Sequence, residues 1–175
     1  MTLTDFNSVT LEECGAALVP DAEITRLMAA AVAEDGIAAG DISTLSIVPD
    51  GQSVTANLVA RESGVLAGLS LLHRAAALEP LEGRVRIEML MADGQPIACG
   101  DILGRVSGQW REVLAYERTL LNLLSRLCGV ASRTARFVAA VQDVAPEVKV
   151  CDSRKTTPGL RRFEKYAVRC GGGHL

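Results

Sequence analysis

The sequence predicts a mixed α/β protein in which an α+β unit precedes the beginning of a parallel α/β layer. Two β-rich segments, residues 53–61 and 84–91, are separated by turn residues, as in an antiparallel sheet. After Gly108 long helical periodicity takes over, and a short β segment at 148–151 is followed directly by a polar loop and another helix. Strand, loop and helix in this order are typical of parallel layers, where ligands bind at the carboxyl ends of strands.

The first predicted helix begins at Asp21, a suitable N-cap, and stops at Gly36. Its apolar face is formed by Ile24, Leu27, Met28, Ala31 and Val32. The small polar residues 40–44 predict a turn, and residues 53–61 predict a strand that ends before the turn residues 62–64. A short helix is expected from Leu71 to Leu78.

Residues 84–91 alternate strictly, with Val85, Ile87 and Met89 on one side, which predicts a half-buried strand. Asp93-Gly94 is a strong hairpin signal, and a second β segment follows between Ile97 and Val106. These elements complete the predicted N-terminal domain, residues 1–110.

Residues 111–175 form the second predicted domain. A helix is expected from Trp110 to Leu127, with Gly129 as its stop, and a separate helix from Ser132 to Gln142. The first of these carries a wide leucine-rich face and, beside it, a narrow polar stripe of Arg118, Asn122 and Ser125. A last helix is expected over about 161–170.

The segment Asp152–Arg162 is the most informative part of the chain. Six Arg and Lys residues oppose two carboxylates between Asp152 and Arg169, and Pro158-Gly159 imposes a turn. Arg offers a planar fork of donors, Lys a compact charge, and flanking hydroxyls can complete the coordination of a carboxylate or phosphate. The residues therefore suit a loop that grips small anions. A solvated helix face with a salt-bridged turn explains the composition equally well.

Overall charge excludes a general polyanion binder. Residues 1–110 carry six Arg and Lys against fifteen Asp and Glu, whereas residues 111–175 carry twelve against six. Aromatic residues make up only 3% of the chain, too few for the stacking platforms of nucleic-acid binders. No apolar stretch is long enough for a membrane span, so we expect neither nucleic-acid nor membrane partners.

Cysteine and histidine usage points to a cytoplasmic protein without its own metal-ligand set. The five cysteines are widely spaced, form no Cys-x-x-Cys and are expected to be free, mostly buried thiols. Only two histidines exist, which excludes a His-rich metal site. The N-terminus shows no secretory signal.

The chain resembles the quinolinate phosphoribosyltransferase family, also called nicotinate-nucleotide pyrophosphorylase (carboxylating). The resemblance runs nearly end to end, and its specificity comes from the order and spacing of several motifs. These are Glu34-Asp35 with 40–44, Ala60–Gly68, Asp93-Gly94, Gly100-Asp101, Glu117–Asn122, Leu127–Ala131, Asp152–Arg161 and Glu164–Val168 before the triple glycine.

The resemblance implies an α/β sandwich followed by an incomplete α/β barrel. It implies transfer of phosphoribose from 5-phosphoribosyl-1-pyrophosphate to quinolinate with Mg²⁺, giving nicotinate mononucleotide, pyrophosphate and carbon dioxide for NAD biosynthesis. In the family the site lies at a dimer interface, so Arg118 is expected to reach the site of a second copy. The family's Thr-Arg-Lys corresponds to Ser153, Arg154 and Lys155, and Ser keeps the hydroxyl. No catalytic residue is assigned.

Two departures from the family pattern stand out. Ser132-Arg133-Thr134 is bulkier and more charged than the usual stretch there, and His174 lies too early to take the role of the family's histidine. The family's later His-Arg pair, lysine and carboxylates would lie beyond Leu175, so we expect the chain to be part of a longer protein and inactive alone. Two alternatives stay open: a related phosphoribosyltransferase-like protein associated with molybdenum transport, and a non-catalytic binding or assembly module.

Overall fold

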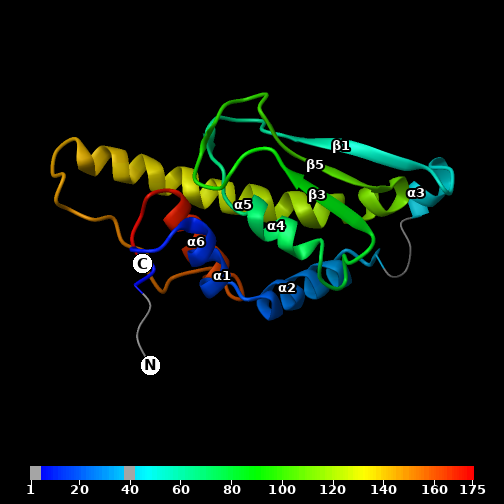
Figure 1. Ribbon diagram of the computed structural model, residues 1–175, viewed down its shortest axis with the longest axis horizontal. Coiled ribbons are helices and arrows are strands. Elements are labelled where there is room, and N and C mark those ends of the chain that lie inside the picture. The colour runs from blue at the N-terminus through cyan, green and yellow to red at the C-terminus, as the bar shows by residue number, and fades with distance from the viewer. Residues whose placement is uncertain (1–4, 38–41) are drawn as a thin grey trace.

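The computed structural model describes residues 5–37 and 42–175, which form a sheet layer packed on a layer of helices (Figure 1). The helices are α1 (Leu11–Leu18), α2 (Asp21–Glu34), α3 (Ile42–Ile47), α4 (Leu69–Ala75), α5 (Trp110–Gln142) and α6 (Arg161–Cys170). The strands are β1 (Ser53–Val59), β2 (Gly64–Val65), β3 (Val85–Met89), β4 (Pro96–Ile97) and β5 (Ile102–Gln109).

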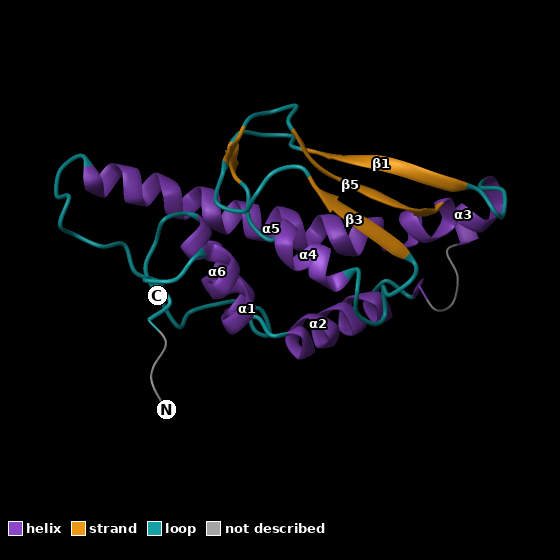
Figure 2. Cartoon of the chain, viewed as in Figure 1, coloured by secondary structure: helices purple, strands orange, loops and turns teal. Residues whose placement is uncertain are grey.

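The main sheet has three antiparallel strands in the order β1-β5-β3, as the alternating segments predict. Ile87 pairs with Val106 in the register of β3 with β5, and both side chains are buried. Helices α4 and α5 cover this apolar face (Figure 2). On the opposite face Arg105 and Glu88 form an exposed ion pair at 3.2 Å. One buried and one solvated face account for the alternation in the sequence.

The Asp93-Gly94 turn is present and the segments on either side of it do pair, but the turn does not close a tight hairpin between them. Strand β3 pairs with β5, while the two-residue strand β4 pairs with β2. Asp93 instead receives hydrogen bonds from the backbone N–H groups of Leu69 at 2.9 Å and Ser70 at 3.3 Å, at the start of α4. The N-cap of α4 is Gly68, which has no side chain to cap the helix, so a distant carboxylate takes this role.

Other helix boundaries also differ from the predictions, including the end of α4 at Ala75, three residues before the predicted Leu78. Pro20, not Asp21, is the N-cap of α2, because the Asp21 carboxylate pairs with Arg74 of α4. Helix α4 begins two residues before the predicted Leu71, where Asp93 caps it. The stop at Gly36 is confirmed: this residue follows α2 with a φ of 66°, a conformation that glycine adopts without strain.

The predicted break at Gly129 is wrong, since α5 is one continuous helix of 33 residues. Leu127 and Ala131, on either side of Gly129, are both fully buried. A single glycine inside a helix costs about 1 kcal/mol relative to alanine, which this packing outweighs.

The predicted strand at 148–151 is reduced to one parallel bridge between Cys151 and His174. The N–H of Asp152 donates to the carbonyl of His174, and the N–H of His174 donates to the carbonyl of Val150, both at 2.9 Å. A longer strand needs successive ladder partners, and among the described residues only the segment around His174 supplies them. The parallel direction agrees with the predicted α/β layer.

The buried core runs across the predicted domain boundary. Phe163 and Tyr166 of α6 are buried beside α1, and a Cβ on Gly15 of α1 would lie 3.1 Å from the Tyr166 ring. Asn7 and Leu175 exchange hydrogen bonds, which joins the two ends of the described chain. The division into residues 1–110 and 111–175 stays a prediction, although α5 begins at this boundary. Among the described residues, no helix is long and apolar enough to cross a membrane.

Candidate anion site

The anion loop, residues 152–160, begins at the carboxyl end of the Cys151 bridge and leads into α6. Within it the Oγ of Ser153 accepts a hydrogen bond from the N–H of Lys155 at 3.2 Å, which closes a tight turn. The side chains of Ser153, Arg154 and Lys155 are exposed. Three of the four predicted site residues are therefore neighbours on one open loop.

The structure divides the six cations of the basic segment into two groups. Those of α6 bind other parts of the chain: Arg161 donates to Thr156 Oγ1, Arg162 to the Leu18 carbonyl, and Arg169 to the Phe6 carbonyl, and Lys165 pairs with Asp152. Arg154 and Lys155 have no ion pair or side-chain hydrogen bond with any described residue. The anion-loop interpretation thus fits these two, whereas the four cations on α6 are engaged within the chain, Lys165 by an ion pair and the three arginines by hydrogen bonds to neutral oxygens.

Successive residues of α6 fix the two ends of the loop. At its start, Asp152 forms an ion pair with Lys165, and the side chain of Asp152 is only 11% exposed. At its end, Glu164 Oε2 accepts a hydrogen bond from the N–H of Thr157 at 3.1 Å. The exposed cations lie between these two attachments.

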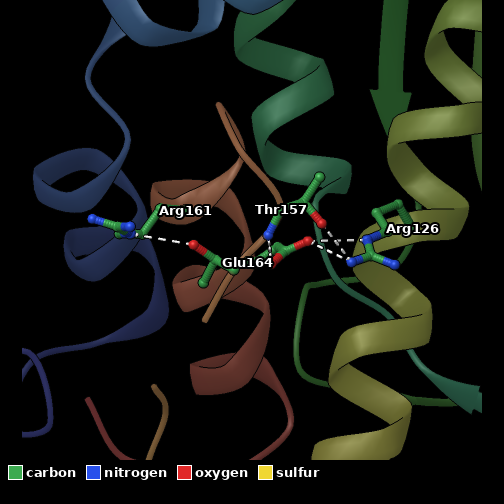
Figure 3. A network of polar contacts seen from close by, with 5 residues as sticks. Arg126, Thr157, Arg161 and Glu164 are labelled. Carbon is green, nitrogen blue, oxygen red and sulfur yellow. Dashed lines mark hydrogen bonds and ion pairs between the residues drawn. The ribbon is translucent and has the colours of Figure 1, made fainter. Parts of the chain in front are cut away.

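Glu164 is the centre of a polar network that joins α5, the loop and α6 (Figure 3). Its Oε1 accepts from Arg126 Nε at 3.0 Å and from Arg126 Nη2 at 2.6 Å. The same Nη2 also donates to Thr157 Oγ1 at 2.9 Å. Burial by itself would raise the pKa of Glu164, but the hydrogen bonds from Arg126 and Thr157 outweigh it and hold the pKa below its ordinary value.

Arg118 lies apart from the loop. Its side chain is 75% exposed on α5, and its one ion pair among the described residues is with Asp35 at a long 3.9 Å. Among the described residues, no hydrogen bond or ion pair joins it to residues 153–155. The other members of the polar stripe, Asn122 and Ser125, line a cavity of about 580 Å³ that Arg118 does not line.

The unusual Ser132-Arg133-Thr134 stretch lies inside α5 and packs locally. Ser132 Oγ accepts a hydrogen bond from the N–H of Val65 at 2.9 Å, and Thr134 is buried with its hydroxyl donating to the Val130 carbonyl. Arg133 lies over the ring of Phe137, 5.4 Å from its centroid. The bulkier side chains therefore cause no break in the helix.

The described residues do not fit a resident Mg²⁺ ion. No group of three or more His, Cys, Asp or Glu side chains among them could hold a metal. The two carboxylates nearest the loop are already engaged, Asp152 by Lys165 and Glu164 by Arg126. A carboxylate paired with a cation is a poor ligand for a divalent ion, so neither of these two is available to hold Mg²⁺.

The sequence did not identify Arg126 or its contact with Glu164, which lies 38 positions further on. Arg126 is two helical turns beyond Arg118, and both are equally plausible as solvated charges on a helix. Only the three-dimensional contact separates them, and no local spacing signals it.

Comparison with known proteins gives the family. The N-terminal domain model of quinolinate phosphoribosyl transferase matches residues 41–128, and the C-terminal domain model of the same family matches residues 130–175. The chain belongs to the quinolinate phosphoribosyltransferase family. The resemblance carried by the sequence motifs is thereby confirmed.

Curated relatives of this family agree. The chain is 38% identical over 140 residues to a probable nicotinate-nucleotide pyrophosphorylase [carboxylating] of Bacillus subtilis, covering 80% of this chain and 47% of that protein. It is 40% identical over 137 residues to the Mycobacterium leprae enzyme of that name, covering 76% of this chain and 46% of that protein. The chain thus spans about half the length of the curated relatives that it matches.

Solved structures confirm the predicted fold class. NadC from Streptococcus pyogenes is 42% identical, with a TM-score of 0.75, and the match covers 84% of this chain and 50% of that one. The nicotinate-nucleotide pyrophosphorylase from Francisella tularensis is 32% identical, with a TM-score of 0.78, covering 99% of this chain and 56% of that one. The α+β unit and the following βα unit therefore belong to the fold of this quinolinate phosphoribosyltransferase family.

Proposed function

We propose that the chain takes part in phosphoribosyl transfer from 5-phosphoribosyl-1-pyrophosphate to quinolinate, with decarboxylation to nicotinate mononucleotide. The observation that carries the proposal is the pair Arg154 and Lys155, whose side chains are exposed and without partners among the described residues on a loop fixed at both ends. Support also comes from the names of the relatives described above. The other two functions considered from the sequence have no comparable support.

The loop suits the charges of this reaction. Quinolinate carries two carboxylates, and the donor carries a phosphate and a pyrophosphate. Fixed cations orient such groups, and they stabilise the negative charge that develops on pyrophosphate as its bond to ribose breaks. In the proposal Arg154 and Lys155 provide these cations, and the hydroxyl of Ser153 supports the turn that presents them.

The proposal includes a second copy of the chain. Arg118 is exposed on α5 and has no contact with the loop among the described residues, as expected if it serves the site of another subunit. Mg²⁺ stays a prediction of the family resemblance. A cytoplasmic location is part of the same proposal and is supported by five cysteines that are all free.

Calorimetric titration of quinolinate and of 5-phosphoribosyl-1-pyrophosphate tests the proposal. Arg154→Ala and Lys155→Ala should each weaken binding of at least one of these anions by about 10- to 100-fold, since hydrogen bonds to charged groups contribute about 1.5–3 kcal/mol. The matched control is Lys149→Ala, which removes an exposed cation before the loop. Equal affinities in both loop variants and in the control would refute the assignment.

A further inference from the structure

We infer that Arg126 and Glu164 are positioning residues that hold the anion loop in its binding conformation without contributing charge to the substrate. The inference rests on the proposed function, because it takes Arg154 and Lys155 as the anion-binding groups. It concerns the contact between α5 and α6, in which Glu164 belongs to a family motif but its partner Arg126 lies outside all of them.

The hydrogen bonds among Arg126, Thr157 and Glu164 form a closed ring that uses both carboxylate oxygens of Glu164. Oε1 receives both Arg126 donors, at 3.0 and 2.6 Å, and Oε2 receives the N–H of Thr157 at 3.1 Å. Arg126 Nη2 completes the cycle by donating to Thr157 Oγ1 at 2.9 Å. Glu164 is only 7% exposed, so these partners replace the water that a free carboxylate would bind.

The hydrogen bonds among Arg126, Thr157 and Glu164 attach the loop where few other backbone donors are available. Thr157 precedes Pro158, which has no N–H, so the Thr157 N–H is the last backbone donor before the turn at Gly159. On the other side of the cations, Ser153 Oγ accepts from the N–H of Lys155, and Arg161 donates to the carbonyl of Arg154 at 3.4 Å. The backbone is thus held around two free side chains, and this preorganisation lowers the entropic cost of binding.

The effect of charge distinguishes positioning of the loop from direct attraction of the anion. Arg126 is neutralised by Glu164 at 2.6 Å, so the pair adds no net charge to the loop. Replacing Glu164 by glutamine raises the net charge near the loop by one unit. A purely electrostatic effect would therefore tighten anion binding, whereas loss of positioning weakens it.

The experiment measures the Kd for inorganic pyrophosphate by calorimetry and the rate of tryptic cleavage after Arg154 and Lys155. Glu164→Gln should raise the Kd about tenfold, the change produced by losing about 1.4 kcal/mol, and should accelerate cleavage at both sites. Glu147→Gln is the matched control, an exposed carboxylate that removes the same charge, and it should leave the Kd unchanged or lower it.

Two further variants keep the test decisive. Arg126→Lys retains a cation beside Glu164 but loses the fork that also reaches Thr157, so its Kd should lie between those of wild type and Glu164→Gln. Thr157→Val removes only the hydroxyl that accepts from Arg126, and it should also raise the Kd and accelerate cleavage. It provides the test if Glu164→Gln does not fold. The double variant Arg126→Lys with Glu164→Gln should bind pyrophosphate no more weakly than Glu164→Gln alone, because the two residues act as one unit.

The outcomes separate the two proposals. If Arg154→Ala weakens pyrophosphate binding while folded Glu164→Gln and Thr157→Val match wild type in Kd and cleavage, the positioning role is overturned and the anion loop stands. Tighter binding by Glu164→Gln also overturns it. If wild type binds no pyrophosphate, or Arg154→Ala leaves the Kd unchanged, the proposed function itself fails.

Discussion

Two glycines, one inside α5 and one packed against it, should respond to alanine in opposite directions. Gly129 lies inside α5, and a Cβ built on it meets no atom within 4 Å. Alanine there adds no clash and removes conformational freedom from the unfolded chain, so Gly129→Ala should stabilise the protein by about 0.5–1 kcal/mol. For a chain of this size 1 kcal/mol raises the Tm by about 2–4 °C.

Gly171, directly after α6, has no such space. A Cβ there would lie 2.3 Å from the carbonyl oxygen of Ala131 and 2.7 Å from Cβ of Thr134, both in α5. A backbone carbonyl inside a helix cannot rotate away as a long side chain can, so the two helices must separate. Gly171→Ala should therefore destabilise the protein by about 1–3 kcal/mol, in the range of overpacked cores.

Urea unfolding followed by circular dichroism measures both effects, with thermal unfolding as a second readout. The slope m should be the same for all three proteins, so that midpoint shifts report free energy of unfolding. If Gly129→Ala destabilises the chain, the residue does not have the helical environment described here, and α5 ends where the sequence suggests. A neutral Gly171→Ala would show that α5 and α6 do not approach each other this closely.

Three other predictions concern buried polar groups and thiols. Tyr166→Phe keeps the buried ring but removes the hydroxyl that donates to Asp93 at 2.8 Å, so the free energy of unfolding should fall by about 1.5–3 kcal/mol in urea titrations; no change would show that this bond contributes nothing. Because the pKa of Glu164 is lowered in the folded state, its stabilisation is fully present above its ordinary pKa of 4.5 and is lost as the pH falls through the lower folded value. Wild type should accordingly lose more stability than Glu164→Gln between about pH 5.5 and pH 3, and parallel losses would contradict the contact with Arg126. Burial raises the pKa of the other three thiols, so an aromatic disulfide reagent at pH 8 should modify the exposed Cys99 and Cys151 rapidly and the rest slowly; five equal rates would contradict the fold.

The sequence predicts well the helices and strands that are determined by residues close together in the chain. Val85 and Ile87 alternate with charged residues because one face of β3 is buried, and the pattern holds over four positions until Met89, predicted on the same side, which is exposed. Gly36 ends α2 because its φ of 66° suits glycine. Helix α6 follows the same rule, since its apolar residues recur on one face and it starts after a Pro-Gly turn.

The predictions that fail depend on partners far along the chain. Asp93-Gly94 closes no tight hairpin, and Asp93 instead caps α4, 24 positions earlier. Gly129 does not stop α5 because Leu127 and Ala131 are buried on both sides of it. Cys99 and Cys151 were expected to be buried but are exposed, since burial follows from where loops lie and not from residue type. For the candidate site, residues 153–155 stay a prediction from the sequence, and the contact of Arg126 with Glu164 that fixes their loop could not be predicted from it.

The number of Arg and Lys residues between Asp152 and Arg169 overstates the positive charge available to a substrate, because four of the six lie on α6. Side chains on a helix point in directions set by its turn, so Arg162, Lys165 and Arg169 each reach a different neighbouring segment. Arg154 and Lys155 precede the helix, and nothing among the described residues competes for them. Two cations can balance the two carboxylates of quinolinate but not also a phosphate and a pyrophosphate. The proposed reaction therefore requires further cations at this loop, and in the proposal the exposed Arg118 of a second copy is one of them.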